Sequence, residues 1–438
     1  MRWARGRSVG WVVAAAAGWL VADAPGALDA QAPGPAPSST AGATAQAWPT
    51  WRGPLGTGEA PAAKPPIEWS DTRNIRWKVP VAGTGKSSPI VWRDTVYLTT
   101  AVPGDGGVQQ FTLLAIARAD GKEKWSRVLH QEKPHEGHHP DGSYAAGSAL
   151  TDGQRLYAWF GSRGLYAIDF TGKVLWEKSF GQMQTRMGFG EGSSVAVHDG
   201  TLVVPWDHEG ADFVIAVDAA TGKEKWRTPR EEPTTWATPL IVAAGGPPQV
   251  VLSGTNHVAG YDLATGTRLW QAGGTTMNAI PSPVFGDGVV IAMGGFRGSM
   301  ARAIRLAEAR GDVSAAPAQA WTYEKDTPYV PSPLLYRGAV YFLKVNSGIL
   351  TSLDARTGAV RFTERLAAVP NVYASPVAAD GRIYVVGREG TTAVLDAGPA
   401  AKVLATNVLS DAIDTTPALV DGELYLRGAR HLYRISAN

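Results

Sequence analysis

The densest group of metal-ligating side chains lies in residues 130–141. This stretch reads His-Gln-Glu-Lys-Pro-His-Glu-Gly-His-His-Pro-Asp and holds four of the chain's eight histidines. Imidazole and carboxylate groups bind Zn²⁺ and other divalent ions, with His135, His138 and His139 as nitrogen donors and Glu136 as an oxygen donor. Proline and glycine prevent a helix from presenting these groups on one face, and the spacing matches no regular metal motif. A solvated loop is the favoured interpretation, and a metal site is the alternative.

A glycine-rich segment, residues 185–193, reads Thr-Arg-Met-Gly-Phe-Gly-Glu-Gly-Ser. A phosphate-binding glycine loop needs a following helix, whose N-terminal amides complete the anion site. Here the apolar residues from Val195 onward predict a strand instead. We therefore interpret the segment as a tight structural crossing between strands and favour that role over ligand binding.

Several kinds of chemistry are excluded by composition. The chain contains no cysteine, which removes disulfides, thiolate metal sites, a cysteine nucleophile, c-type haem attachment and an acylated lipoprotein anchor. Its formal net charge is +2 over 438 residues, so neither nucleic acid nor an anionic membrane surface is an expected partner.

A recurring sequence motif must form the elements that position all of these residues. It reads Ala-Val-Asp-Ala-Ala-Thr-Gly-Lys-Glu-Lys-Trp at 216–226, and variants occupy 167–176, 260–270 and 352–362, with a weaker copy ending at Trp125. Self-similarity at a period of roughly 40–50 residues indicates a propeller or a solenoid. Its aspartate recurs in one register, which predicts capping of a hairpin turn because a catalytic acid is needed only once. These aspartates are Asp169, Asp218, Asp262 and Asp354.

Each copy of the motif predicts a β-hairpin, and a second hairpin precedes it. The second hairpin opens on Ser or Thr, usually followed by Pro, and often turns at Asp-Gly. Two hairpins make the four antiparallel strands of one propeller blade. The openings number eight: Ser88, Ser148, Ser194, Thr238, Ser282, Ser332, Ser375 and Thr416. The sequence therefore predicts an all-β, eight-bladed β-propeller; a seven-bladed ring would require the weak repeat at 282–321 or at 375–404 to be something else.

An aromatic residue closes the last strand of each repeat and suits the wedge between neighbouring sheets. These residues are Trp77, Trp125, Trp176, Trp226, Trp270, Trp321 and Phe362. The eighth repeat ends at 431–435 without a final strand, whereas residues 74–79 read as a final strand that lacks a blade. We expect this N-terminal strand to complete the last blade, because closure removes the exposed sheet edges.

The residues two positions before each blade opening enter the innermost strands, so they should surround one mouth of the central channel. Aromatic and charged groups mixed in this way suit a peptide or a small ligand, and ordinary rim packing is the alternative. The candidate binding residues in this register are Lys86, Trp236, Tyr373 and Asp414, with Ile280 and Val330 also in it and Tyr144 and Tyr329 nearby. Arg186 and Glu191 of the glycine-rich segment are further candidates, which we expect to face the same mouth.

The beginning of the chain has the pattern of a secretory signal. Arg2, Arg5 and Arg7 precede the apolar run 8–22, which is short for a membrane span. We expect a signal peptide at 1–24 with an ambiguous cleavage point, a disordered Ala/Pro/Ser-rich linker at 25–47, and the propeller at 48–438. Export to the periplasm or the extracellular space follows, and an uncleaved N-terminal anchor is the alternative.

The motif Ala-x-Asp-x-x-Thr-Gly-x-x-x-Trp resembles the repeat of the pyrroloquinoline-quinone (PQQ) propeller superfamily. The resemblance covers the chain from about Trp69 to the C-terminus. That superfamily includes eight-bladed quinoprotein alcohol dehydrogenases and the propeller lipoprotein of the bacterial outer-membrane assembly machine. Residues 48–58, Trp-Pro-Thr-Trp-Arg-Gly-Pro-Leu-Gly-Thr-Gly, are similar to the start of a bacterial subfamily of exported PQQ-like proteins. The resemblance is specific for the fold and less so for an activity.

For the dehydrogenases the resemblance implies PQQ over Ca²⁺ or a lanthanide, held by Glu, Asn and Asp ligands, a stacking Trp and commonly a vicinal disulfide. The present chain cannot form that disulfide, and Glu191, Asn256, Asn278 and Asp414 match no such ligand pattern. We therefore predict an exported, monomeric binding or assembly scaffold of the cell envelope. We expect it to have no cofactor and no catalytic activity, and to present a propeller face to a protein or envelope partner. The alternative is a PQQ- and Ca²⁺-dependent dehydrogenase of alcohols or sugars.

Overall fold

The computed structural model describes residues 47–244, 246–315 and 317–437. They all belong to the larger of two compact units of the chain, Thr40–Asn438. The expected signal peptide and the linker up to residue 46 lie outside the described residues, whereas Ala47 is buried. Within the described part, no helix is both long enough and apolar enough to cross a membrane.

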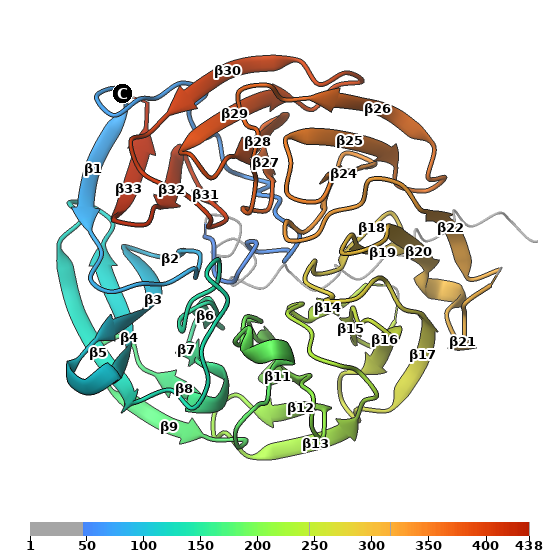
Figure 1. The fold of residues 1–438 in the computed structure, drawn as a ribbon, viewed down its shortest axis with the longest axis horizontal. Helices are drawn as coiled ribbons and strands as arrows, with labels where there is room; N and C mark the ends of the chain where they lie inside the picture. Colours follow the sequence, from blue (N-terminus) through green and yellow to red (C-terminus); the bar gives the residue numbers. More distant parts are fainter. Residues whose placement is uncertain (1–46, 245, 316, 438) are drawn as a thin grey trace, which may run out of the picture. The chain divides into compact units, whose positions relative to one another are not determined.

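Eight antiparallel sheets follow one another around a common axis (Figure 1), which confirms the predicted eight-bladed β-propeller. Blade 1 is β2 (Ile90–Trp92), β3 (Thr95–Pro103), β4 (Gln109–Ala117) and β5 (Glu123–Glu132); blade 2 is β6 (Leu150–Thr151), β7 (Leu156–Trp159), β8 (Leu165–Ile168) and β9 (Val174–Lys178). Blade 3 is β10 (Ala196–His198), β11 (Thr201–Trp206), β12 (Phe213–Asp218) and β13 (Glu224–Pro229); blade 4 begins with β14 (Leu240–Val242), β15 (Gln249–Leu252), β16 (His257–Asp262) and β17 (Arg268–Gly273).

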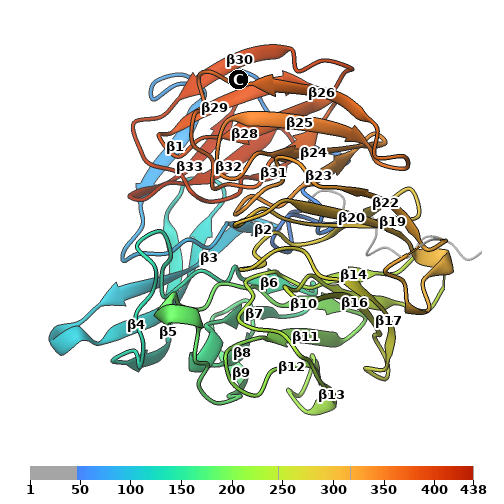
Figure 2. The same ribbon diagram turned by 45° about the vertical axis from the view of Figure 1, so that its right-hand side comes forward.

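The second half of the ring repeats the plan. Blade 5 is β18 (Val284–Gly286), β19 (Val289–Gly294), β20 (Met300–Arg305) and β22 (Gln319–Tyr323); blade 6 is β23 (Leu334–Tyr336), β24 (Ala339–Leu343), β25 (Ile349–Asp354) and β26 (Val360–Arg365). Blade 7 is β27 (Val377–Ala379), β28 (Arg382–Val386), β29 (Thr391–Asp396) and β30 (Val403–Val408); blade 8 contains β31 (Ala418–Val420), β32 (Glu423–Arg427) and β33 (His431–Ser436). The 3₁₀ turns are η1 (Asp105–Gly107), η2 (Gly161–Arg163), η3 (Arg186–Gly188) and η4 (Leu306–Glu308). The hairpin of β3 and β4, with strands of nine residues, extends away from the ring (Figure 2).

The two ends of the described chain close the ring in one sheet. Strand β1 (Ile75–Pro80) pairs antiparallel with β33, with Trp77 opposite Arg434 and Val79 opposite Leu432. The predicted N-terminal final strand of the last blade is therefore confirmed.

A tryptophan–glycine contact joins successive blades. The Trp176 indole donates a hydrogen bond to the carbonyl of Ala219 in the next blade at 3.2 Å. Its ring lies against Gly222, where an added Cβ would meet ring carbons at 2.8 Å. Because Gly222 also has φ +71°, the turn requires glycine for its backbone and for this contact. The same contact pairs Trp77 with Gly121, Trp125 with Gly172, Trp226 with Gly266 and Trp321 with Gly358.

Blade 4 departs from the expected four strands. The segment before β22 contains η4 and β21 (Gly311–Asp312), which pairs parallel with β17 and adds a fifth strand. Blade 5 therefore lacks the Asp-x-x-Thr-Gly turn whose glycine, in other blades, contacts the tryptophan of the preceding blade. Trp270 instead donates to Gln249 of its own blade at 2.9 Å.

The blade-opening residues form a closed hydrogen-bonded ring around the axis. Each Ser or Thr hydroxyl oxygen accepts the backbone N–H of the equivalent residue in the preceding blade, as Ser148 does from Ser88 at 2.9 Å. The Thr416 amide closes the ring by donating to the Ser88 hydroxyl at 2.9 Å. We call these eight residues the hydroxyl ring: Ser88, Ser148, Ser194, Thr238, Ser282, Ser332, Ser375 and Thr416.

The N-terminal segment 48–58, called the plug, closes one end of the axis. Trp48 is fully buried and pairs with Val91 of blade 1. Arg52 is also fully buried and donates to the carbonyls of Pro333 at 2.6 Å and Pro376 at 3.3 Å, which follow the hydroxyl ring in blades 6 and 7. Burial lowers the pKa of Arg52 to about 9, so the guanidinium remains charged at neutral pH. The plug therefore binds backbone acceptors from two blades through one cation.

Candidate functional site

The other end of the axis, which we call the mouth, opens into a cavity of about 230 Å³. All eight positions two residues before the hydroxyl ring line it: Lys86, Ala146, Gly192, Trp236, Ile280, Val330, Tyr373 and Asp414. Its floor consists of the plug residue Trp51 and six hydroxyl-ring members, Ser88, Ser194, Thr238, Ser332, Ser375 and Thr416. The same register in every blade thus builds the rim, because each innermost strand starts at the same height.

Six of the eight candidate binding residues line this cavity: Lys86, Glu191, Trp236, Tyr329, Tyr373 and Asp414. Tyr144 and Arg186 are not among the residues that line it. Tyr144 instead packs against the His138 ring, 4.6 Å between centroids, and beside the Arg163 guanidinium. Arg186 begins η3, and it is Phe189, just after that turn, that reaches the cavity.

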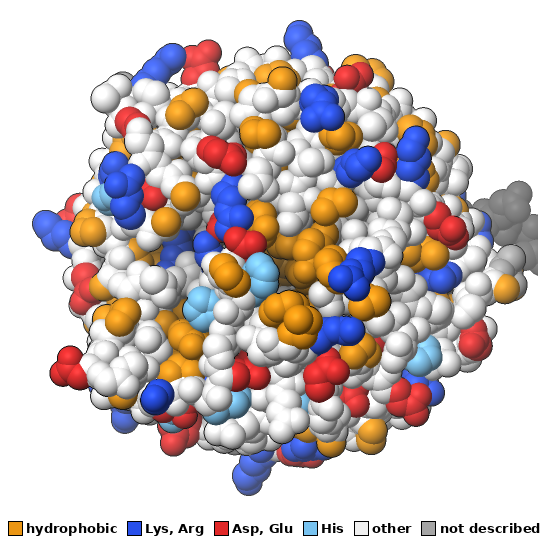
Figure 3. Space-filling model, viewed as in Figure 1, with side chains coloured by type: hydrophobic (Ala, Val, Ile, Leu, Met, Phe, Trp, Pro, Cys, Tyr) orange, Lys and Arg blue, Asp and Glu red, His pale blue; other side chains and the backbone are white. Residues whose placement is uncertain are grey.

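Blades 3 to 6 supply an apolar wall. It consists of Phe189, Trp236, Ile280, Tyr329 and Val330. Trp236 is fixed by donating its indole N–H to the Gly190 carbonyl at 2.7 Å. Figure 3 shows hydrophobic side chains gathered around the hollow at the centre of this face, with charged and histidine side chains along one side.

Blades 7, 8, 1 and 2 supply a charged wall. Lys86 Nζ lies 2.5 Å from Asp414 Oδ2, and Arg388 Nε lies 3.1 Å from Asp414 Oδ1. Arg388 Nη2 also lies 2.5 Å from Asp141 Oδ1, and the Tyr373 hydroxyl donates to Asp141 Oδ2 at 2.9 Å. Two cations and two carboxylates therefore neutralise one another within this wall.

These contacts shift the titration of the acidic groups. Burial would raise the pKa of Asp141, but hydrogen bonds from Arg388 and Tyr373 outweigh it and hold the pKa below its usual range. Burial, followed by the hydrogen bond to Asp141, raises the pKa of Tyr373. Both groups therefore keep their ordinary neutral-pH forms, carboxylate and phenol, across the physiological range.

Residues 137–143, which we call the strap, belong to the connection between blades 1 and 2 and bring Asp141 into contact with Arg388 and Tyr373 of blade 7. The His139 amide donates to the Phe189 carbonyl at 2.9 Å, and the two rings meet edge to face at 5.2 Å. At its other end Asp141 is held by Arg388 and Tyr373. The strap therefore covers part of the mouth and is fastened on both sides.

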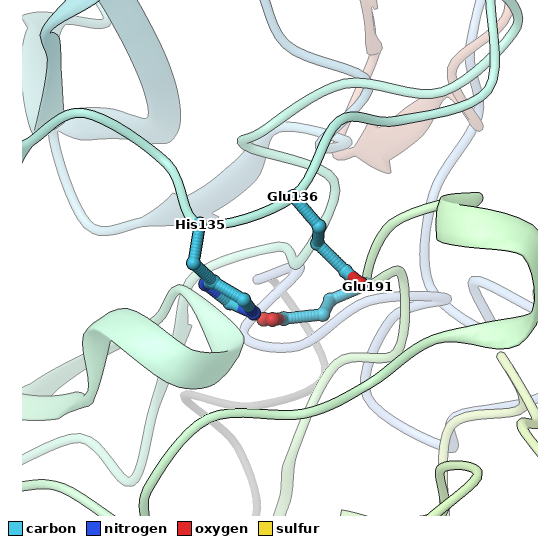
Figure 4. A group of neighbouring side chains, drawn as sticks. All are labelled: His135, Glu136 and Glu191. Carbon is cyan, nitrogen blue, oxygen red and sulfur yellow. The ribbon is translucent and has the colours of Figure 1, made fainter.

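The histidine-rich stretch does not converge on one point. His135 lies with Glu136 and Glu191, and their potential ligand atoms are within 4.8 Å of one another (Figure 4). His135 Nε2 is 2.8 Å from the Met183 carbonyl oxygen, and Glu136 accepts from the Thr185 hydroxyl at 2.7 Å. His138 and His139 instead pack on Tyr144 and Phe189.

The Glu191 side chain is only 10% exposed. It accepts the Ser162 amide at 2.6 Å and the Arg163 guanidinium at 3.1 Å. Burial raises its pKa above the usual value, against the opposing effects of Arg163 and Ser162. A metal ion here would have to displace Arg163, so we interpret the group as a hydrogen-bonded junction between the strap and blades 2 and 3.

The cavity residues do not fit the PQQ and Ca²⁺ arrangement that the resemblance implies. Among the described lining residues no side-chain amide occurs, and Asp141, Glu191 and Asp414 are each already paired with a basic side chain. Asn256 and Asn278 lie outside the lining. Ca²⁺ needs six to eight oxygen ligands, and the described lining offers no free set of them.

Comparison with known proteins now places the chain. The profile of one family, described as outer membrane protein assembly factor BamB, matches residues 67–188, 171–315 and 301–438. The chain belongs to this BamB-like family of PQQ-repeat propellers. A sequence comparison with curated proteins gives no match.

Solved structures share the fold with this BamB-like chain at low sequence identity. BamB from Moraxella catarrhalis is 13% identical, with 82% of this chain and 99% of that chain covered and a TM-score of 0.55. A quinohemoprotein alcohol dehydrogenase from Comamonas testosteroni is 12% identical, with 90% and 81% covered and a TM-score of 0.66. The computationally designed Ika8 protein is 12% identical, with 81% and 98% covered and a TM-score of 0.52. An assembly factor, an enzyme and a designed protein share this fold, so the fold alone does not select a function.

Sequence reasoning missed three parts of the site. The hydroxyl ring was visible as a recurrent Ser or Thr, but it was interpreted only as a blade opening. Trp51 belongs to a segment outside the repeats, and Arg388 sits in a turn whose partner Asp141 is 247 residues away. The register of the repeats could have indicated the ring, whereas no local signal pointed to Arg388.

Proposed function

We propose that this protein is an exported binding and assembly propeller of the cell envelope that holds a partner at its mouth and catalyses no reaction. The observation that carries the proposal is the pairing within the cavity: its carboxylates are engaged by Arg388, Lys86 and Arg163. Catalysis needs an acid, base or nucleophile held ready for a substrate. The BamB-like family match and the secretory pattern of the first residues support an envelope role.

The rim around the mouth has the composition of a protein-binding surface. Met187 is 81% exposed and adopts φ +54° in η3. Phe296 and Tyr329 stack at 4.8 Å between centroids, and Arg297 lies over Phe296 at 5.4 Å. Flexible methionine, aromatic rings and arginine are enriched at protein interfaces.

Site-specific photo-crosslinking in the producing cell tests this proposal. A photoreactive residue at Met187 should give a discrete crosslinked partner. The matched control is Val360, which is 56% exposed on the outer strand β26 and should give none. Equal crosslinking at both positions, or none at Met187, would contradict a binding role for the mouth.

A PQQ-dependent dehydrogenase is the second candidate, because the repeat resembles that of the PQQ propeller superfamily, which includes quinoprotein alcohol dehydrogenases. Titration of the purified protein with PQQ and Ca²⁺ distinguishes the two. The binding proposal predicts no saturable change in PQQ absorbance and no dye-linked oxidation of alcohols or sugars. Saturation together with turnover would establish the enzyme instead.

A further inference from the structure

The carboxylates of the axial cavity are already paired with basic or hydroxyl groups. Both oxygens of Asp141 accept hydrogen bonds, from Arg388 and Tyr373. Asp414 Oδ2 accepts from Lys86 and Arg388, and Asp414 Oδ1, which accepts no hydrogen bond, lies 3.1 Å from Arg388 Nε. Glu191 accepts from Ser162 and Arg163. A ligand that brings hydrogen-bond donors therefore finds no free carboxylate among the described lining residues.

The hydrogen-bond donors of the cavity, in contrast, are only partly used. Lys86 is the only lysine or arginine among the described lining residues, its side chain is 32% exposed, and one of its three N–H groups is used by Asp414. His139 Nδ1 accepts the Asp141 amide at 3.1 Å. The neutral imidazole therefore carries its proton on Nε2, as a further donor.

The floor adds hydroxyl donors. Each hydroxyl-ring oxygen already accepts a backbone N–H, as Ser194 does from Ser148 at 3.0 Å. Within residues 47–244, 246–315 and 317–437, none of the eight hydroxyls donates its proton to a protein acceptor. Six of them line the cavity, so their O–H groups are available to a ligand oxygen.

The volume of the cavity and its apolar wall indicate what the rest of the ligand is. About 230 Å³ is below the roughly 300–1,000 Å³ of sites for drug-sized molecules. This volume suits one ring or one branched chain with a small head group. The apolar wall of Trp236, Ile280 and Val330 faces the charged wall across this space.

We infer that the cavity binds a small carboxylate carried on an apolar ring or branched chain. The carboxylate accepts hydrogen bonds from Lys86 and the floor hydroxyls, and the apolar body lies against Trp236 and Ile280. The inference deepens the proposed function, because it rests on the mouth being the binding face. The carboxylate belongs either to a free acid or to the last residue of a peptide chain, since both present the same chemistry.

Calorimetric titration of the full protein at pH 7.5 with 3-phenylpropionate tests the inference. The acid should bind, and the corresponding amide and amine should bind at least tenfold more weakly, because they lack the charged acceptor. Equal binding of the amide, or no binding of the acid, would overturn it.

Variants test the assigned residues. Lys86→Met should weaken binding of the acid at least tenfold, whereas Lys122→Met, at a position 82% exposed on blade 1, should leave it unchanged. Lys86→Arg keeps donors beside Asp414 and should retain binding, which separates loss of the ligand contact from loss of folding. Ile280→Trp should fill the cavity and abolish binding; wild-type affinity in Lys86→Met or in Ile280→Trp would overturn the inference.

A tripeptide ending in Phe, with a free or an amidated C-terminus, distinguishes the sources. Competition by the free form alone assigns a chain end, and binding of 3-phenylpropionate without such competition assigns a free acid. Ligand binding without a crosslink at Met187 would remove the partner proposal and keep this inference. A crosslink at Met187 without ligand binding would remove this inference and keep the partner proposal.

Discussion

The two ends of the propeller axis use the same repeats for opposite purposes. At the plugged end, Trp48 and Arg52 are fully buried, and the axis is filled by a segment that belongs to no repeat. At the mouth, the equivalent register of all eight blades surrounds a cavity. The difference shows that the eightfold repeat leaves an open channel along its axis and that a separate segment is needed to close it.

The chemistry of the two ends differs in the same way. The plugged end presents backbone carbonyls, Pro333 and Pro376, and Arg52 satisfies them. The mouth presents different side chains from each blade, and cations pair there with carboxylates, as Lys86 does with Asp414. Backbone atoms are the same in every repeat, whereas side chains vary, so the plugged end offers the same acceptors from blade to blade and the mouth does not.

The largest expected effect comes from removing the buried cation of the plug. Arg52→Met should lower the free energy of unfolding by about 3 kcal/mol, because buried carbonyls lose their donor. Denaturant unfolding measures it. Arg73→Met, at a side chain 65% exposed, is the matched control and should change stability by less than about 0.5 kcal/mol; similar values for both would remove the contrast between the ends.

Opening the floor should affect both ends. Trp51→Ala removes a half-buried indole that lines the cavity from below. We expect a loss of about 2 kcal/mol in unfolding free energy, together with weaker binding of 3-phenylpropionate because the cavity loses its floor. Unchanged ligand affinity would show that the plug and the mouth are independent.

The outer turns provide a calibration away from both ends. Asp218 accepts the Thr221 hydroxyl at 2.7 Å and the Thr221 amide at 2.9 Å, and these hydrogen bonds hold its pKa below the usual value. Asp218→Ala should cost about 1 kcal/mol of stability and leave ligand binding unaltered. Normal thermal stability combined with lost binding would contradict a purely structural role.

The smallest effect is expected at the strap. Asp141→Ala should change global stability by less than about 1 kcal/mol, yet it should speed hydrogen exchange of the amides in residues 137–143. Because the folded-state pKa of Asp141 is lowered, the contact is present above the usual aspartate pKa and is lost as the pH falls through the lower folded value. Exchange of the strap amides should therefore be constant from pH 8 to 5 after correction for the intrinsic rate, and should rise only below about pH 4. A rise at a higher pH would contradict this account of the contact.

The fold was predictable because its determinants are local. The spacing from Gly222 to Trp226 encodes a turn and the aromatic that contacts the next turn, and the lone strand around Trp77 indicated closure. The register rule also predicted that Lys86, Trp236 and Asp414 meet at one mouth. Tyr144 and Arg186 do not hold register positions and do not line the cavity, and they lie in loops whose course is set by contacts with other blades.

Only the tertiary structure decided how the side chains at the mouth pair with one another. The sequence by itself determined the number of blades, their closure and the height at which each innermost strand begins, because hydrogen bonds between adjacent strands and turns depend on neighbouring residues. The strap carrying Asp141 to Arg388, the plug under the cavity and the closed hydroxyl ring depend on contacts between residues far apart in the chain. The recurrent Ser or Thr could have indicated the ring, but the contacts of the strap and the plug leave no pattern in one sequence, since the path of a long loop is chosen by the surface on which it packs.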